Sequence, residues 1–266
     1  MTESNWKVVV DSDRLTISSD AFTFTTNGMD PLQLETVVAD LQSAVRGTYG
    51  QYCGLAQAAE MVGERWGFLI VRDLLAGPKS AAELHAGLPK LSVKLLSRRL
   101  NELEYTGVVR PAADADDQGE ERYELTEYGR AAEDAVLSFG RWGAAALAKP
   151  RPDDIVTDAS LTIALRAMFV AEAARDVHTS YEVHIGGHVL HLHIDDGTLK
   201  VGLGPLPGAD SVLRLGVALQ GLVTGQTTVA DVLSSGAVSI EGDPELFTDF
   251  VTMFQLPRIP SPKVHV

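Results

Sequence analysis

The middle of the chain carries an ordered set of helix signals that few folds satisfy. Ser80 stands at the start of one short helical pattern, with Glu83 three residues later, which is the spacing of a capping box. Residues 87–89 (Gly-Leu-Pro) then turn the chain. Ser92 precedes a second helical pattern, whose leucines recur on one face. The order predicts two short helices joined by a tight turn.

The segments around these two helices further restrict the folds that the chain can adopt. Residues 108–110 and 122–125 are strand-like and flank a polar, acidic loop, which is typical of a hairpin. One longer helical pattern precedes the pair, over residues 52–77, and another comes after the hairpin, from Thr126 to about residue 147. Helices in this order, with a hairpin and then a long helix, predict a winged helix-turn-helix.

The second helix of such a motif enters the major groove of DNA, so its exposed face is the candidate contact surface. Leucines 95, 96, 100 and 103 form the apolar stripe that we expect to be buried. The opposite face offers cations for phosphates or guanine and hydroxyl or amide groups for base edges. With the arginines at the hairpin base, the predicted DNA-binding residues are Ser92, Val93, Lys94, Ser97, Arg98, Arg99, Asn101, Arg110 and Arg122. The alternative is an ordinary solvated helix surface, because Lys and Arg are usually exposed.

The charge distribution around the two short helices favours DNA contact over an ordinary solvated surface. The 266 residues carry a net charge of −14, which is unfavourable for binding phosphates. Residues 64–110 nevertheless hold eight basic and five acidic side chains, whereas residues 151–266 hold seven basic and fourteen acidic ones. The predicted helix-turn-helix is therefore a basic island in an acidic chain.

Composition excludes several other classes. Cys53 is the single cysteine, so a disulfide framework and a thiolate metal cluster are excluded. Nothing approaches the roughly 18 apolar residues that span a bilayer, and the early segment does not resemble a signal peptide. We expect a cytoplasmic protein that does not associate with membranes.

Segments on either side of the winged helix complete the predicted layout. Residues 1–51 predict a small ββα-type extension, with extended segments at 6–10, 14–18 and 22–26 and a helix that begins at Asp30-Pro31. The predicted domains are residues 1–51, 52–148 and 155–266, joined by a proline-containing linker at 149–154. The last of these alternates helices and short strands, so the whole chain is predicted to be α+β.

The central segment resembles a known family, the HxlR-type regulators, which are relatives of the MarR group. The resemblance rests on Cys53, residues 63–70 (GERWGFLI), 74–79 (LLAGPK), 91–100 (LSVKLLSRRL), 102–104, 107–109 and 123–129 (YELTEYG). It implies a homodimer on a palindromic operator of double-stranded DNA, with terminal helices at the dimer interface. In that family a cysteine at the position of Cys53 sometimes senses electrophiles or oxidants; the alternative is a small buried hydrophobe.

Two departures from the family pattern concern DNA contact. Ser80-Ala81 stands where the family usually has a basic and an aromatic residue. The wing tip carries acidic residues where phosphate contact would favour Lys or Arg, namely Asp114, Asp116, Asp117, Glu120 and Glu121. Acidic side chains near phosphates lower affinity.

The C-terminal segment resembles the sterol-carrier-protein-2-like (SCP2-like) fold between about residues 155 and 257. The resemblance rests on residues 209–215, 219–225, 229–233, 236–243 and 246–254. It implies an apolar tunnel for a hydrophobic small molecule, which would act as an effector of the DNA-binding domain. The candidate lining residues are Leu219, Leu222, Val223, Phe247, Phe250, Val251 and Phe254. The alternative is that they fill an ordinary core.

Five histidines between residues 178 and 193 raise the question of a metal site. A two-residue hairpin at Gly186-Gly187 would place Glu182, His184, His191 and His193 on one face of two paired strands. We expect this to be a polar outer face of the sheet and predict no metal and no cofactor.

These patterns predict a dimeric, ligand-responsive transcriptional regulator. The alternative function is a carrier of lipids or small molecules that uses its helix-turn-helix for dimerisation or protein contacts. An enzyme is not expected, because the sequence offers no nucleophile–base pair, phosphate loop or convincing metal motif.

Overall fold

The computed structural model describes most of the chain, in residues 7–11, 14–18, 23–27, 48–63, 65–113, 120–147, 151–216 and 218–257. The chain divides into two compact units, Met1–Glu64 and Arg65–Val266. Three predicted features lie outside the described residues: the helix from Asp30, the wing-tip residues 114–119 and the start of the linker at 149–150. The predicted domain boundaries therefore stay predictions.

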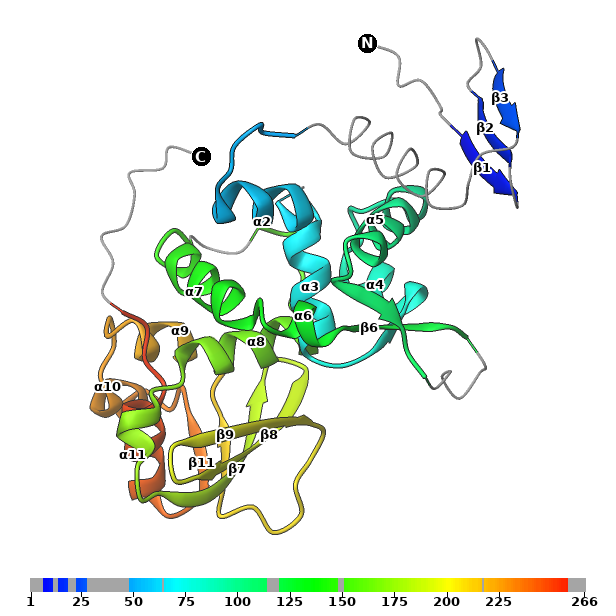
Figure 1. The fold of residues 1–266 in the computed structure, drawn as a ribbon. Helices are drawn as coiled ribbons and strands as arrows, with labels where there is room; N and C mark the ends of the chain where they lie inside the picture. The colour runs from blue at the N-terminus through cyan, green and yellow to red at the C-terminus, as the bar shows by residue number, and fades with distance from the viewer. Residues whose placement is uncertain are drawn as a thin grey trace. The chain divides into compact units, whose positions relative to one another are not determined.

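The first unit contains a small antiparallel sheet in the order β1-β2-β3. Its strands are β1 (Lys7–Asp11), β2 (Arg14–Ser18) and β3 (Thr23–Asn27), which confirms the three predicted extended segments. Helix α2 (Gly54–Val62) comes later in the chain (Figure 1). The Glu60 carboxylate accepts hydrogen bonds from the Thr48 hydroxyl (2.8 Å) and the Tyr49 amide (2.7 Å), so the preceding segment is tied to this helix.

The winged helix-turn-helix is confirmed in the second unit (Figure 1). Its elements are α3 (Gly67–Leu75), β4 (Lys79–Ser80), α4 (Ala81–Gly87), α5 (Val93–Tyr105), β5 (Val109–Pro111), β6 (Arg122–Leu125), α6 (Glu127–Arg130) and α7 (Glu133–Ala144).

Side-chain caps fix where these helices begin. Ser80 accepts a hydrogen bond from the Glu83 amide (3.2 Å), and the Glu83 carboxylate accepts one from the Ser80 amide (2.7 Å), which confirms the predicted capping box. Ser92 caps α5 through the Leu95 amide (3.3 Å), and Thr126 caps α6 in the same way. Each cap satisfies a backbone N–H that has no partner inside its helix.

Two helices that the sequence pattern predicted as continuous are divided in the structure. The pattern over residues 52–77 is interrupted: α2 ends at Val62, with Gly63 as its C-cap residue, and α3 begins only at Gly67. Glycine is a weak helix former and ends a helix readily. The pattern from Thr126 is split into α6 and α7, because the Ala132 amide bonds the carbonyl three residues back, at Gly129, and tightens the turn (3.2 Å).

The wing also contains one strand more than predicted. Strand β4 pairs antiparallel with β6, with Lys79 opposite Tyr123 and Ser80 opposite Arg122, so the sheet order is β4-β6-β5. A two-residue strand has no hydrophobic periodicity of its own, and only its pairing partner defines it.

The C-terminal part is a five-stranded sheet with helices on one face, as an α+β layout predicts (Figure 1). Its elements are α8 (Asp158–Met168), the 3₁₀ helix η1 (Ala171–Ala174), β7 (His178–Ile185), β8 (His188–Asp195), β9 (Thr198–Leu203), β10 (Ser211–Arg214), α9 (Ala218–Val223), α10 (Val229–Ser234), β11 (Ser239–Gly242) and α11 (Pro244–Met253). The strand order is β11-β10-β7-β8-β9, and only the β10–β7 pair among them is parallel. The predicted hairpin register, with Ile185 opposite His188, is confirmed.

The core of this C-terminal part lies between the sheet and its helices. Buried side chains from β7, β8 and β10 meet those of α8, α9 and α11. Two phenylalanines of the last helix, Phe247 and Phe250, and the following Phe254 are fully buried, and the rings of Phe250 and Phe254 stack with centroids 4.5 Å apart. The opposite face of the sheet carries polar residues.

A close backbone approach fixes α6 against the base of the wing. A Cβ added at Gly129 would lie 2.1 Å from the Val108 carbonyl oxygen, so the backbone would have to shift. We therefore expect Gly129→Ala to lower the free energy of unfolding by about 1–3 kcal/mol, measured by urea denaturation. Gly140→Ala in α7 is the matched control, because a Cβ there meets no atom within 4 Å. Equal effects of the two changes would contradict this close packing of α6 on the wing.

Candidate nucleic-acid interface

Helix α5 buries one stripe of leucines and presents the opposite face to solvent. Leu96, Leu100 and Leu103 are each at most 2 % exposed. Burying a leucine contributes about 1.5–3 kcal/mol, so this stripe fixes the rotation of the helix about its axis. Six of the seven predicted DNA-binding residues at or on this helix are exposed, namely Ser92, Val93, Lys94, Ser97, Arg98 and Asn101.

The cations of α5 differ in how accessible they are. Lys94 is exposed and forms no ion pair with any residue that the structure describes. Arg98 donates to the Glu102 carboxylate (3.0 Å) with its side chain 54 % exposed, whereas Arg99 pairs with the same carboxylate with its side chain only 13 % exposed. An exposed pair one helical turn apart contributes about 0.3–0.5 kcal/mol, so Arg98 exchanges Glu102 for a phosphate at little cost. Arg99 is placed to brace the helix more than to meet a ligand.

The arginines at the wing base are also held by carboxylates. Arg110 and Glu124 are cross-strand partners, and their ion pair is 2.7 Å long. Arg130 of α6 approaches the other oxygen of Glu124 at 3.6 Å, and both arginines stay more than half exposed. Arg130 is not among the residues predicted from sequence, because only the turn after Thr126 brings it back toward the wing.

Arg122 lies in a different environment from Arg110. Its guanidinium donates to the Pro78 carbonyl and lies 3.5 Å from the Glu83 carboxylate, with a side chain 30 % exposed. These contacts join the wing to the turn before α4 and to the capping box of that helix. The geometry therefore gives Arg122 a bracing role in addition to any phosphate contact.

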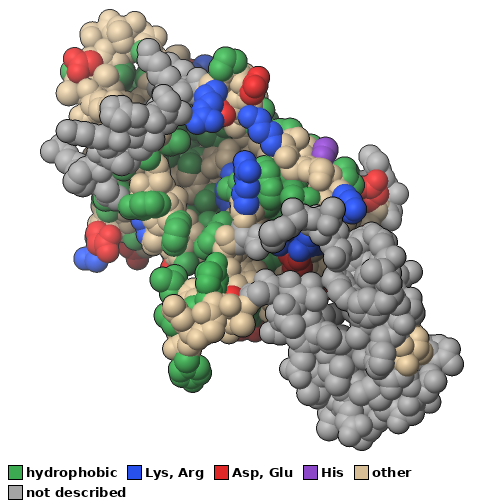
Figure 2. Space-filling model, turned by 90° about the horizontal axis from the view of Figure 1, so that it is seen from above, with side chains coloured by type: hydrophobic (Ala, Val, Ile, Leu, Met, Phe, Trp, Pro, Cys, Tyr) green, Lys and Arg blue, Asp and Glu red, His purple; other side chains and the backbone are tan. Residues whose placement is uncertain are grey.

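Helix α5 presents exposed hydrophobic side chains beside its exposed cations, namely Val93 (61 % exposed) and Tyr105 (49 % exposed). Figure 2 shows several Lys and Arg side chains gathered on one face of the molecule, beside exposed hydrophobic side chains. A surface of this kind neutralises phosphates and also contacts bases or another protein. Glu120 and Glu121, the described part of the acidic wing tip, are exposed.

Helix α7 carries an exposed aromatic face. Phe139 is 53 % exposed and Trp142 is 67 % exposed. Phe139 stacks on Phe68 of α3, with ring centroids 5.3 Å apart, and meets the Trp142 ring edge-on at 6.2 Å. Large aromatic side chains in one exposed group are typical of a protein–protein contact.

Cys53 is exposed at the start of α2, where it is the N-cap residue. The backbone N–H groups of Ala56 and Leu55 favour the thiolate form and lower the pKa of Cys53 below its usual value. The alternative of a buried hydrophobe is wrong for the chain as described, because this thiol reaches solvent.

The seven predicted ligand-lining residues come together in the core of the C-terminal part. Leu219, Leu222, Val223, Phe247, Phe250 and Phe254 are all buried, and Val251 packs against them half-buried. These side chains form one cluster with the buried residues of β7, β8 and β10.

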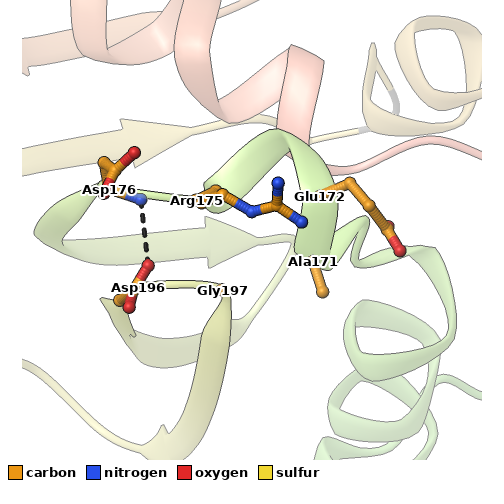
Figure 3. Close-up of a pocket in the computed structure, with 6 residues that line it drawn as sticks. All are labelled: Ala171, Glu172, Arg175, Asp176, Asp196 and Gly197. Atoms are coloured by element: carbon orange, nitrogen blue, oxygen red, sulfur yellow. Dashed lines mark hydrogen bonds between the residues drawn. The ribbon is translucent and has the colours of Figure 1, made fainter.

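A polar pocket lies elsewhere, between η1 and the β8–β9 turn (Figure 3). It is lined by Ala171, Glu172, Arg175, Asp176, Asp196 and Gly197. The Asp176 amide donates to the Asp196 carboxylate (3.1 Å), and both aspartates have positive φ, at 60° and 43°. Its charged walls do not suit a hydrophobic molecule, and it contains none of the predicted lining residues.

Polar side chains on the outer face of the sheet anchor the segment that crosses from β9 to β10. Glu182 accepts hydrogen bonds from the Leu206 amide (2.7 Å) and from His184 Nε2 (2.7 Å), and these contacts lower the pKa of its carboxyl group. His191 Nδ1 bonds the Gly204 carbonyl (3.1 Å). Among the described residues, no group of three His, Cys, Asp or Glu side chains is arranged to hold a metal ion.

The described residues include no helix both long enough and apolar enough to cross a lipid bilayer.

Comparison with known proteins identifies relatives of the central segment. The model of the HxlR-like helix-turn-helix family matches residues 61–150. YvaP of Bacillus subtilis (strain 168), an HTH-type transcriptional regulator, is 36 % identical over 86 residues, which are 32 % of this chain and 80 % of YvaP. YodB, an HTH-type transcriptional regulator of the same organism, is 32 % identical over 88 residues, which are 33 % of this chain and 79 % of YodB.

A solved structure of quinone-bound YodB is also similar to the chain. It is 31 % identical in sequence and covers 34 % of this chain and 93 % of that one, with a TM-score of 0.29. These matches each cover about a third of the chain.

Proposed function

The chain belongs to the HxlR-like helix-turn-helix family, and from this membership we propose that it is a dimeric transcriptional regulator controlled through its C-terminal part. Its relatives are HTH-type transcriptional regulators, which bind DNA and are not enzymes. A protein with this function works where the chromosome lies, and we therefore propose a cytoplasmic location.

The exposed face of α5 is the observation that carries the proposal. The buried leucine stripe directs Lys94, Arg98 and Asn101 outward together. Lys94 supplies a phosphate contact, while Arg98 and Asn101 offer hydrogen bonds to guanine and adenine edges. Arg110 and Arg130 at the wing base extend the cationic surface along the backbone of the same DNA.

We propose that the second copy binds through α7. The exposed Phe139 and Trp142, supported by Phe68, give this helix an apolar surface that a symmetric partner would cover. A two-fold dimer presents two recognition helices, so the operator is expected to be palindromic, with half-sites about one helical turn apart.

Substitutions on α5 test the DNA-binding proposal. We expect Lys94→Ala to weaken binding about tenfold and to lower the slope of log affinity against log salt by about 1, because one phosphate contact is lost. Arg98→Ala should weaken binding by a similar factor and relax sequence preference at one base pair. Both effects are measured by mobility shift, at several salt concentrations, on the DNA upstream of the protein's own gene.

Lys200→Ala is the matched control, because Lys200 is an exposed lysine on β9 of the C-terminal part. Its affinity and salt slope should equal those of the wild type. Binding that is absent, or indifferent to salt and to all three changes, would favour the alternative function of a carrier whose helix-turn-helix serves only protein contacts.

We further propose that a hydrophobic effector binds in the C-terminal part, in an SCP2-like manner. Two observations support this: the apolar cluster between sheet and helices, and a buried polar atom within it. Because the candidate lining residues are buried between the sheet and its helices, we expect an effector to enter by displacing a covering helix. Its binding then shifts the population of the dimer between two geometries.

The buried polar atom is the hydroxyl oxygen of Ser211. Ser211 is 0 % exposed, shares the core face of β10 with Leu213, and lies opposite Tyr181 of β7. Its hydroxyl has no hydrogen-bond partner among the described residues, whereas the Tyr181 hydroxyl donates to the Leu246 carbonyl (3.0 Å). A buried hydroxyl without a partner costs about 1–3 kcal/mol, and an effector with one hydrogen-bonding end would remove that cost.

Substitution of Ser211 tests this effector proposal. We expect Ser211→Ala to raise the free energy of unfolding of the ligand-free protein by about 1 kcal/mol and to weaken binding of long-chain fatty alcohols, measured by displacement of a fluorescent apolar probe. Ser180→Ala is the control and should destabilise, because its hydroxyl is bonded to Asp210 (2.7 Å). Wild-type protein that binds none of these alcohols, and purifies without an apolar molecule in native mass spectrometry, would leave the cluster as an ordinary core.

Cys53 is proposed as a second, redox-responsive input. Its exposure and lowered pKa favour the thiolate, which is the reactive form. We expect alkylation of the full chain to show a midpoint pH below about 8.5, the value of an unperturbed cysteine, with no labelling of Cys53→Ser. A midpoint at or above that of free cysteine would refute the role.

A further inference from the structure

Helix α8 packs into the core of the C-terminal sheet on one side and against α3 and α7 on another. Leu165 and Met168 are part of the core of the C-terminal sheet. Ala159, Ile163 and Ala167 are equally buried but lie outside that core, and α8 packs against α3 and α7 of the winged helix domain. Figure 1 shows α8 between those helices and the five-stranded sheet. A helix that is buried on nearly every side transmits movement from one neighbour to the other.

Arg166 connects α8 to both helices of the winged helix domain. Its guanidinium donates to the Leu75 carbonyl, in the last turn of α3, at 3.1 Å. The same group forms an ion pair with Glu133, in the first turn of α7. A cation at a helix C-terminus and an anion at a helix N-terminus both complement the helix dipole. Arg166 at the end of α3 and Glu133 at the start of α7 are therefore each in a favourable position.

A second hydrogen bond joins the same two domains, and its donor lies on α7 and its acceptor on α8. Arg141 of α7 donates to the Ala167 carbonyl, the residue after Arg166, at 3.2 Å. The two domains are therefore joined by arginine-to-carbonyl bonds from both sides, in addition to the covalent linker.

The two helices that Arg166 holds have different tasks under the proposed function. Helix α3 leads through Gly77 and Pro78 directly into β4 and α4, and Arg122 of the wing bonds the Pro78 carbonyl. Helix α7 carries the exposed aromatic face. The spacing between α3 and α7 thus determines where the DNA-reading helices lie relative to the second copy.

We infer that Arg166 is a positioning residue, which locks the C-terminal part onto α3 and α7 and so sets the placement of the recognition helix. The effect on DNA rests on the proposed function, whereas the locking itself does not. An effector that shifts α8 from the side of Leu165 and Met168 acts on DNA through this residue.

The locking is tested by the distance between two spin labels in one chain. Labels at Glu104→Cys on α5 and Lys200→Cys on β9, both exposed sites, are introduced in a Cys53→Ser background. Dilution with unlabelled protein removes signals between copies. We expect one narrow distance distribution for the parent, a broadened or shifted one for Arg166→Ala, and a narrow one for Arg166→Lys, which keeps the charge and a donor.

Arg214→Ala is the matched control, because Arg214 forms its ion pair with Glu241 inside the C-terminal part (2.6 Å). Its distribution should equal that of the parent. Glu133→Gln keeps α7 intact and should give an intermediate width, which preserves the test if Arg166→Ala does not fold. A distribution for Arg166→Ala and Glu133→Gln that matches the parent would overturn the inference.

DNA affinity of the unlabelled variants separates this inference from the function it builds on. We expect Arg166→Ala to bind about 5- to 10-fold more weakly, within the range usual for coupled sites, and Arg166→Lys to bind normally. Loss of DNA binding in the wild type would refute the proposed function, while a broadened distance in Arg166→Ala would still support the locking.

Discussion

Burial of the leucine stripe on α5 sets the orientation of the exposed side chains that we propose face DNA. Leu96, Leu100 and Leu103 are almost completely removed from water, and a rotation of the helix would expose them at a cost of several kcal/mol. The observed orientation of the helix about its axis therefore also fixes which side chains reach solvent. The position of Lys94, Arg98 and Asn101 is therefore a consequence of hydrophobic packing on the other side of the helix.

Electrostatics then adjusts how strongly that surface attracts DNA. Glu102 and Glu124 each pair with two arginines, and Glu83 lies near a fifth arginine, Arg122. The pairs of Arg98, Arg110 and Arg130, whose side chains are more than half exposed, are weak, and a phosphate competes with them easily. In a chain with a net charge of −14, carboxylates that hold the arginines keep non-specific attraction low. This arrangement suits the proposed regulator, which would rely on base contacts and dimerisation.

Local signals made much of the fold predictable from sequence. The cap at Ser80 and the hairpin register at Gly186-Gly187 depend on neighbouring residues only, and both are confirmed. The close approach of Gly129 to the wing and the strand β4 were not predicted, because each depends on a contact with a distant segment.

In the candidate site, too, the local features were predicted from sequence and the long-range contacts were not. Helical periodicity predicted the exposed face of α5, but it could not show that Arg99 is mostly buried. It also could not show that Arg122 reaches the Pro78 carbonyl, since that contact depends on the pairing of β4 with β6. The double role of α8 is invisible in the sequence for a related reason. Its buried residues surround the helix, and periodicity alone does not say which neighbour each one meets.

Hydroxyl-radical footprinting of the full chain on the DNA upstream of its own gene is the decisive experiment for a symmetric DNA-binding dimer. We expect two protected patches of equal extent, about 10 base pairs apart on one face of the duplex and related by two-fold symmetry. A single protected patch would contradict the symmetric dimer. Absence of any protection at low salt would contradict the DNA-binding function itself.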